Sequence, residues 1–182
     1  IHVHQPDGIF TGVLKYLGWE DYYRPDTAGI PMFYLCHLPE TTVGELRQYL
    51  MEKLHLNGLR YIGDPGAKVS RVGLCAHLYP GGFCPQQGGD SEVYADYATL
   101  LIGEMEKENG IEVLIPGEII EWDILCYIRD AVAMGKNKAC MNIGHFNLEE
   151  LGMRYMADWL PGLLDGTLPV TYVPTGDIFQ YE

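Results

Sequence analysis

The stretch that decides the fold is segment 115–160, IPGEIIEWDILCYIRDAVAMGKNKACMNIGHFNLEELGMRYMADWL. Near its end an apolar run over 138–143 stops at Gly144, and an amphipathic pattern typical of a helix starts soon after. The pattern predicts a strand followed directly by a helix. His145 and Glu149 should then emerge at the carboxyl end of the strand, which is where α/β sheets bind ligands.

The start of that helix has its own sequence signal. Asn147 is a favourable N-cap residue, and Glu150 three positions later completes an N-x-x-E capping pattern. This reading places Glu149 in the first turn of the helix and leaves its carboxylate available for another role.

Outward from this segment, strand and helix patterns alternate along the chain, which predicts an α/β fold with a sheet-centred core. A length of 182 residues suits one domain, 1–182, because such a chain can bury roughly 70% of its unfolded surface. The expected helices cover 9–17, 42–54, 91–107, 118–134 and 148–164, and the expected strands cover 32–36, 69–75, 112–115, 138–143 and 170–173, with a Gly-rich loop over 79–89.

Charge and cysteine content narrow the function classes. The chain has 25 acidic and 12 basic residues and a formal charge of −13, which disfavours direct binding to nucleic acids and to anionic membranes. Its five cysteines form no C-x-x-C pair, so we expect a cytoplasmic protein with reduced thiols. No apolar stretch approaches the ~20 residues of a membrane span.

Imidazole, carboxylate and amide side chains follow several of the predicted strands. Imidazole with carboxylate suits divalent zinc, iron or manganese, so the set is a candidate metal site. The alternative is that each histidine only caps a helix or packs in the core. The candidates are His2, His4, Gln5, His37, Glu40, His145 and Glu149.

Glu118 is the second kind of candidate. In the expected helix 118–134 it would sit in the first turn, where the helix dipole alone favours an acid. The functional alternative is that Glu118 points into the same cleft and hydrogen-bonds a metal ligand or a bound water.

These residues lie in longer motifs that resemble the NIF-three-like family. The resemblance covers nearly the whole chain and is strongest in G-E-x-x-E-W over 117–122, G-H-x-x-x-E-E-x-G-M over 144–153 and VPTGDIF over 173–179. It implies a NIF-three-like α/β fold, with a mixed sheet flanked by helices, and a hexamer that carries a dinuclear metal centre. The family has roughly one more β-α unit ahead of its H-x-P motif, which corresponds to His4-Gln5-Pro6 here, so we expect that unit to be missing.

The resemblance carries His4, His145 and Glu149 over as metal ligands. Gln5 stands where the family has a second His or a Glu, and a neutral amide is the weaker ligand. Thr41 stands in place of a bridging Asp, although Glu40 could reach the same point. One or two metal ions per chain are implied, one tight and one weak.

The function implied is that of a metal-dependent hydrolase acting on a small molecule or nucleotide, with Glu118 as the proton-transfer residue. Some relatives carry the label of a type-two GTP cyclohydrolase I, but fold alone does not transfer that label. The alternative is a non-catalytic metal-binding or regulatory scaffold. Both readings expect a homo-oligomer, a hexamer by resemblance.

Overall fold

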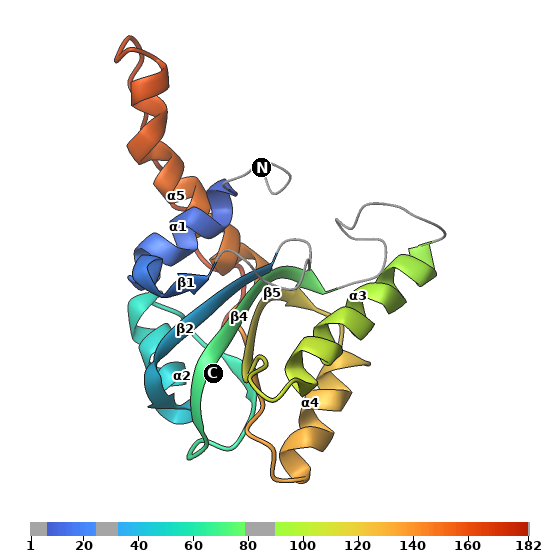
Figure 1. Ribbon diagram of the computed structural model, residues 1–182. Helices are drawn as coiled ribbons and strands as arrows, with labels where there is room; N and C mark the ends of the chain where they lie inside the picture. Colours follow the sequence, from blue (N-terminus) through green and yellow to red (C-terminus); the bar gives the residue numbers. More distant parts are fainter. Residues whose placement is uncertain (1–6, 25–32, 79–89, 182) are drawn as a thin grey trace.

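The computed structural model describes residues 7–24, 33–78 and 90–181, and its elements are labelled in Figure 1. The helices are α1 (Gly8–Leu17), α2 (Val43–Lys53), α3 (Asp90–Glu106), α4 (Ile124–Ala133) and α5 (His145–Leu163), with a 3-10 turn, η1 (Glu20–Tyr22). The strands are β1 (Tyr23–Arg24), β2 (Phe33–Thr42), β3 (Arg60–Ile62), β4 (Lys68–Leu78), β5 (Val113–Ile119) and β6 (Ala139–Asn142). The predicted α/β class is therefore confirmed.

The described strands form one mixed sheet in the order β1-β2-β4-β5-β6-β3. Strands β4, β5 and β6 are parallel, and β1, β2 and β3 join them through antiparallel pairs. The carboxyl ends of β5 and β6 therefore share one edge of the sheet. Strand β2 runs the other way, so its last residue, Thr42, pairs with Lys68 at the opposite edge.

Helices cover both faces of this sheet, and each face has its own core (Figure 1). Alternate residues of the strands face the two cores, as their period of two requires. On β4, for example, Leu74 packs with α1 and α2, whereas Cys75 packs with α3 and α4. Burial raises the pKa of the Cys75 thiol well above its usual value, so this cysteine acts as an apolar core residue.

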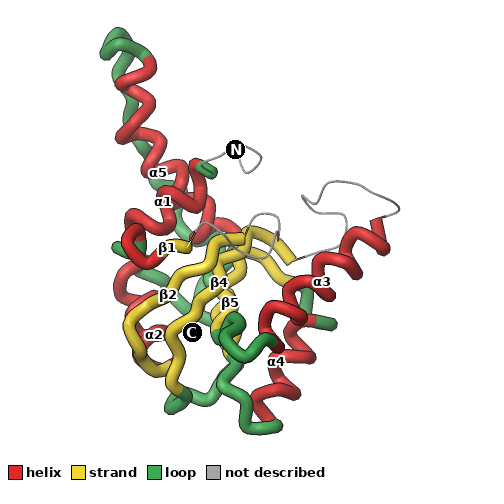
Figure 2. The backbone as a smooth tube through the Cα atoms, viewed as in Figure 1, coloured by secondary structure: helices red, strands yellow, loops and turns green. Residues whose placement is uncertain are grey.

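Helices α1 and α5 cross at a pair of glycines, Gly12 and Gly152. A Cβ added at Gly12 would lie 2.6 Å from the carbonyl oxygen of Leu151, and one added at Gly152 would lie 2.4 Å from the Cα of Ile9. The two backbones are therefore in direct contact, which fixes α5 over the sheet. Beyond this crossing α5 projects from the body, and the chain that follows it runs back alongside (Figures 1 and 2).

The first two helices begin at conventional caps. The buried carboxylate of Asp7 accepts hydrogen bonds from the backbone N–H groups of Ile9 and Phe10 at the start of α1. Thr42 and Glu45 form a reciprocal capping box at the start of α2. Both arrangements satisfy N–H groups that have no partner within the helix.

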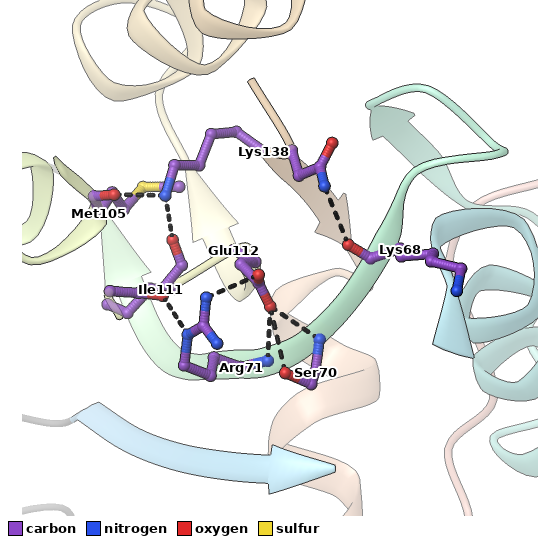
Figure 3. Close-up of polar contacts among 9 residues, drawn as sticks. Lys68, Ser70, Arg71, Met105, Ile111, Glu112 and Lys138 are labelled. Carbon is purple, nitrogen blue, oxygen red and sulfur yellow. Dashed lines mark hydrogen bonds and ion pairs between the residues drawn. The ribbon is translucent and has the colours of Figure 1, made fainter. Parts of the chain in front are cut away.

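A polar network joins the amino ends of β5 and β6 to their surroundings (Figure 3). The Glu112 carboxylate accepts from the backbone N–H groups of Ser70 and Arg71, at 2.7 and 3.0 Å, and pairs with the Arg71 guanidinium at 2.7 Å. The Lys138 ammonium donates to the carbonyl oxygens of Met105 and Ile111, and burial lowers its pKa. Hydrogen bonds and an ion pair within the protein therefore hold the amino ends of β5 and β6 in place.

The structure corrects the predicted helix 118–134. Strand β5 continues to Ile119, and α4 begins only at Ile124. The cause is pairing with the neighbouring strand, because Glu118 and Ile119 both have register partners on β4. Glu118 is thus a strand residue, while Trp122 lies in the loop and is exposed.

The predicted cap of the last helix is also wrong. Helix α5 begins at His145 with Gly144 as N-cap, and Asn147 donates its side-chain amide to the carbonyl of Ile143 instead. Glu149 therefore lies in the second turn. Glu150 accepts hydrogen bonds from the C-terminal chain, where the expected strand 170–173 has no strand structure.

No helix within the described ranges is both long enough and apolar enough to cross a membrane.

Candidate functional site

His145 and Glu118 meet at the carboxyl edge of the parallel strands. Glu118 is the penultimate residue of β5, and His145 is the first residue of α5, close behind the end of β6. The Nδ1 atom of His145 lies 2.9 Å from Oε2 of Glu118. Residues 27 positions apart in the chain are thus brought into hydrogen-bond contact by the parallel pairing of β5 with β6.

Glu149 contacts the other nitrogen of the same imidazole. It follows His145 by four residues, one turn along α5, so both side chains lie on the same face of the helix. Its Oε1 atom is 3.1 Å from Nε2 of His145. The imidazole is therefore held between two carboxylates, one from a strand and one from a helix. We call these three residues the His145 cluster.

The His145 cluster is half-exposed, with side-chain exposures of 44% for His145, 50% for Glu118 and 35% for Glu149. Ion pairs with this much solvent contribute only about 0–1 kcal/mol to stability. Both ring nitrogens donate at once only in the imidazolium form, whereas a metal ion binds a nitrogen that carries no proton. The cluster can therefore exchange a proton for a cation at one nitrogen while a carboxylate holds the other.

Two atoms of the His145 cluster are suitable ligands for a metal ion. Nε2 of His145 and Oε1 of Glu149 are a nitrogen and an oxygen donor side by side, a pairing that suits zinc, iron or manganese. Within ranges 7–24, 33–78 and 90–181, no group of three or more His, Cys, Asp or Glu residues is arranged to hold a metal ion. His145 and Glu149 thus fit as two donors of a larger set. The expected ligands His4 and Gln5, like His2, lie outside the described residues.

Glu40 does not join the His145 cluster, contrary to expectation. It lies near the end of β2 and pairs with Lys68 at 2.7 Å, with both side chains mostly exposed. The prediction requires the end of β2 to lie at the same edge of the sheet as His145. Because β2 is antiparallel to β4, its end lies at the opposite edge. His37, on the same strand, pairs in register with Arg71 and is likewise not part of the cluster.

A pocket near the ends of β5 and β6 was not predicted from the sequence. It has a volume of about 300 Å³ and lies where β3, β6 and α4 meet. Its charged residues are Arg60, Glu121 and Arg129. Strand β3, which brings Arg60 to this edge, is only three residues long and gives too short a pattern to identify in the sequence.

Comparison with known proteins adds information on the fold. Neither a protein-family model nor a curated protein matches the sequence. Among solved structures, protein ybgI, described as of unknown function, matches with a TM-score of 0.62 and 21% identity over 97% of this chain and 59% of its own. Staphylococcus aureus protein SA1388 matches with a TM-score of 0.54 and 17% identity over 82% of this chain and 42% of its own.

A third solved structure carries a family description. It is a Bacillus cereus protein related to NIF3, with a TM-score of 0.52 and 20% identity over 82% of this chain and 36% of its own. The present chain therefore spans between about a third and three fifths of these matched structures. The chain has the NIF3-like α/β fold, as the sequence motifs predicted.

Proposed function

We propose that this chain is a metal-binding protein whose bound divalent ion supports a hydrolytic reaction. One observation carries the proposal: the His145 imidazole is held between Glu118 and Glu149 at the carboxyl edge of parallel strands. A solvent-accessible imidazole between two acids adds little to stability, so a chemical role explains the arrangement better.

The geometry of the cluster supports a distinct role for each of its residues. Metal-bound histidines usually donate their second N–H to a carboxylate, which fixes the ring and its tautomer. Glu118 is placed to do this at Nδ1, which leaves Nε2 as the metal-binding nitrogen with Glu149 as the neighbouring oxygen ligand. His4 and Gln5, predicted from the motifs, would supply further donors for one or two ions per chain.

A bound divalent ion would lower the pKa of a water molecule and polarise a carbonyl or phosphoryl oxygen. Beside it, Glu118 would hold the His145 ring and would also be the carboxylate that accepts or returns a proton, as predicted from the sequence. Small molecules and nucleotides are the proposed substrates.

The decisive experiment measures metal content and affinity by elemental analysis and calorimetric titration. We expect His145→Ala to weaken binding of zinc or manganese by more than the 10–100-fold that is typical for loss of a supporting contact. The matched control is His55→Asn, which removes an exposed histidine outside the cluster at a positive φ of 53° that Asn tolerates. Equal binding by the two variants would contradict the proposed site.

Two substitutions at Glu118 separate its roles. Glu118→Gln keeps an oxygen that can accept from Nδ1 but removes the basic carboxylate, so metal binding should persist while hydrolysis of bis(p-nitrophenyl) phosphate is lost. Glu118→Ala should weaken both. Full hydrolytic activity in Glu118→Gln would remove Glu118 from the proton-transfer role and leave it as a positioning residue.

The second candidate function is a self-associating scaffold, and the C-terminal part of the chain, from the end of α5 to residue 181, favours it. Large apolar side chains there are exposed, among them Leu163 at 74%, Ile178 at 78% and Phe179 at 65%. Exposed apolar side chains are common at protein interfaces, which agrees with the proposed homo-hexamer. We expect sedimentation to give an oligomer that Ile178→Asp weakens, whereas a monomer at micromolar concentration would exclude the assembly.

A further inference from the structure

The pocket between β3, β6 and α4 combines an apolar floor with a charged rim. Apolar residues of the sheet and of α4 that belong to the adjacent core form the floor. Polar residues from the start of β3, the loop before α4, the middle of α4 and the end of β6 form the rim. The floor contains Ile62, Ile119, Leu125 and Cys140, and the rim contains Arg60, Glu121, Arg129 and Asn142.

The rim brings two basic side chains to the surface of an acidic chain. Two guanidinium groups, Arg60 and Arg129, and one carboxylate, Glu121, line the pocket of a chain whose formal charge is −13. Guanidinium groups are the side chains best suited to paired hydrogen bonds with a carboxylate or phosphate. The pocket thus presents two guanidinium groups on an otherwise acidic protein.

Both guanidinium groups have carboxylate partners that an incoming anion could replace. Arg60 pairs with Glu121 at 2.6 Å, and each of these side chains is 70% exposed. Arg129 pairs with its neighbour Asp130 at 2.8 Å, with exposures of 66% and 64%. Pairs so exposed contribute about 0–1 kcal/mol, so exchanging the partner costs little.

From this combination we propose that the pocket binds a small organic anion with an apolar body. The apolar part would cover Ile119 and Leu125, and a carboxylate or phosphate group would bind Arg60 and Arg129. A volume of about 300 Å³ is at the lower end of the range for ligand pockets, which favours a ligand no larger than a substituted aromatic ring.

The pocket and the His145 cluster belong to the same edge of the sheet. Ile119 of the floor follows Glu118 directly, and Asn142 of the rim precedes His145 by three residues. Ile119 and Cys140 of the floor belong to the core beneath α3 and α4, whereas Leu148 of α5, one turn after His145, packs in the core on the other face of the sheet. The pocket is therefore a separate site, and its occupancy does not require a metal ion at His145.

Cys126 supplies a reporter for this pocket, because it lines the pocket and is partly exposed, whereas the other cysteines in the described ranges, Cys36, Cys75 and Cys140, are buried. The experiment measures the rate at which N-ethylmaleimide modifies Cys126, by peptide mass spectrometry, with EDTA present to remove metal ions. Phenyl phosphate should slow the reaction in a saturable manner, and uncharged benzyl alcohol at the same concentration should not. If Cys126 reacts too slowly to follow, calorimetric titration with phenyl phosphate makes the same comparison.

Substitutions of the rim arginines test whether they bind the phenyl phosphate that protects Cys126. Arg60→Gln and Arg129→Gln should each weaken phenyl phosphate binding about tenfold, the expected loss for one charge-assisted hydrogen bond. Lys136→Gln removes the same charge at the opposite edge and should leave binding unchanged, and so should His145→Ala. The proposal is overturned if phenyl phosphate gives no protection, if benzyl alcohol protects equally, or if both arginine variants bind as tightly as the wild type.

Discussion

Replacing Gly152 with alanine should test whether the contact between α1 and α5 holds the helix that carries His145. A Cβ at Gly152 would lie 2.4 Å from the Cα and 2.5 Å from the Cδ1 of Ile9. Ordinary carbon contacts begin near 3.4 Å, so the two helices would have to separate by about 1 Å. Backbone atoms stand on both sides of this contact, so a side-chain rotation cannot relieve it.

The size of the effect follows from two opposing contributions. Alanine in a helix interior is favoured over glycine by about 1 kcal/mol. Against this, forcing an extra methyl group into a packed contact typically costs 1–3 kcal/mol and more where the backbone must move. Separation would also loosen Phe10 and Val13 of α1, which are both fully buried. We expect a net destabilisation of about 2 kcal/mol, or a fall in Tm of about 4–8 °C.

Circular dichroism during urea and thermal unfolding, at a fixed protomer concentration, measures this difference. Gly162→Ala is the matched control, because Gly162 belongs to the same helix and an added Cβ there meets nothing within 4 Å. That control should be as stable as the wild type or slightly more stable. If Gly152→Ala proves as stable as Gly162→Ala, the close crossing of α1 and α5 does not hold α5 in place.

Two further predictions concern polar contacts. Thr42→Ala removes the capping box and should cost about 1 kcal/mol in urea unfolding. Hydrogen bonds from the backbone N–H and the hydroxyl of Thr42, and then from the Thr41 hydroxyl, lower the pKa of Glu45 in the folded protein. The stabilisation from this contact is therefore present above the ordinary pKa of 4.5 and is lost as the pH falls through the folded value. The destabilisation by Thr42→Ala should shrink in acid, and a difference that does not depend on pH would refute this prediction. Glu112→Gln breaks the ion pair between Glu112, which is 14% exposed, and Arg71, which is 24% exposed. It should lower the free energy of unfolding by roughly 2 kcal/mol, whereas Glu108→Gln on the exposed surface should leave it unchanged.

The spacing of apolar residues in the sequence predicted the long helices and strands. It failed where pairing between distant strands decides whether a segment is helix or strand. Helix α2 and strand β4 have unambiguous patterns, and both form close to where the sequence places them. The helical pattern beginning at Glu118 failed because β4 offers a pairing partner to β5 that the local sequence cannot reveal. Strand direction is likewise a property of the sheet, so the sequence could not show that the end of β2 lies far from His145.

The candidate site was predictable in its residues but not in its contacts. The sequence placed His145 and Glu149 together at the carboxyl end of a strand, and the structure brings them to 3.1 Å within one helix. The contact between His145 and Glu118 depends on parallel pairing over a long separation in sequence. Arg60 was missed for the same reason, because only its pairing with Asn142 brings it to the edge beside the His145 cluster.

The register between β5 and β6 determines whether Glu118 can contact His145. Leu114 pairs with Cys140 on β6, and the same register carried forward places Glu118 beside Gly144, directly before His145. A shift of one residue would turn Glu118 to the other face of the sheet and remove its contact with the imidazole. Gly117 keeps α5 close enough for that contact, because a Cβ there would lie 2.7 Å from Cδ2 of Leu148 and 2.6 Å from the carbonyl oxygen of Ala76. The Gly-Glu pair of the motif therefore acts as a unit, in which the glycine admits the helix and the glutamate holds the first side chain of that helix.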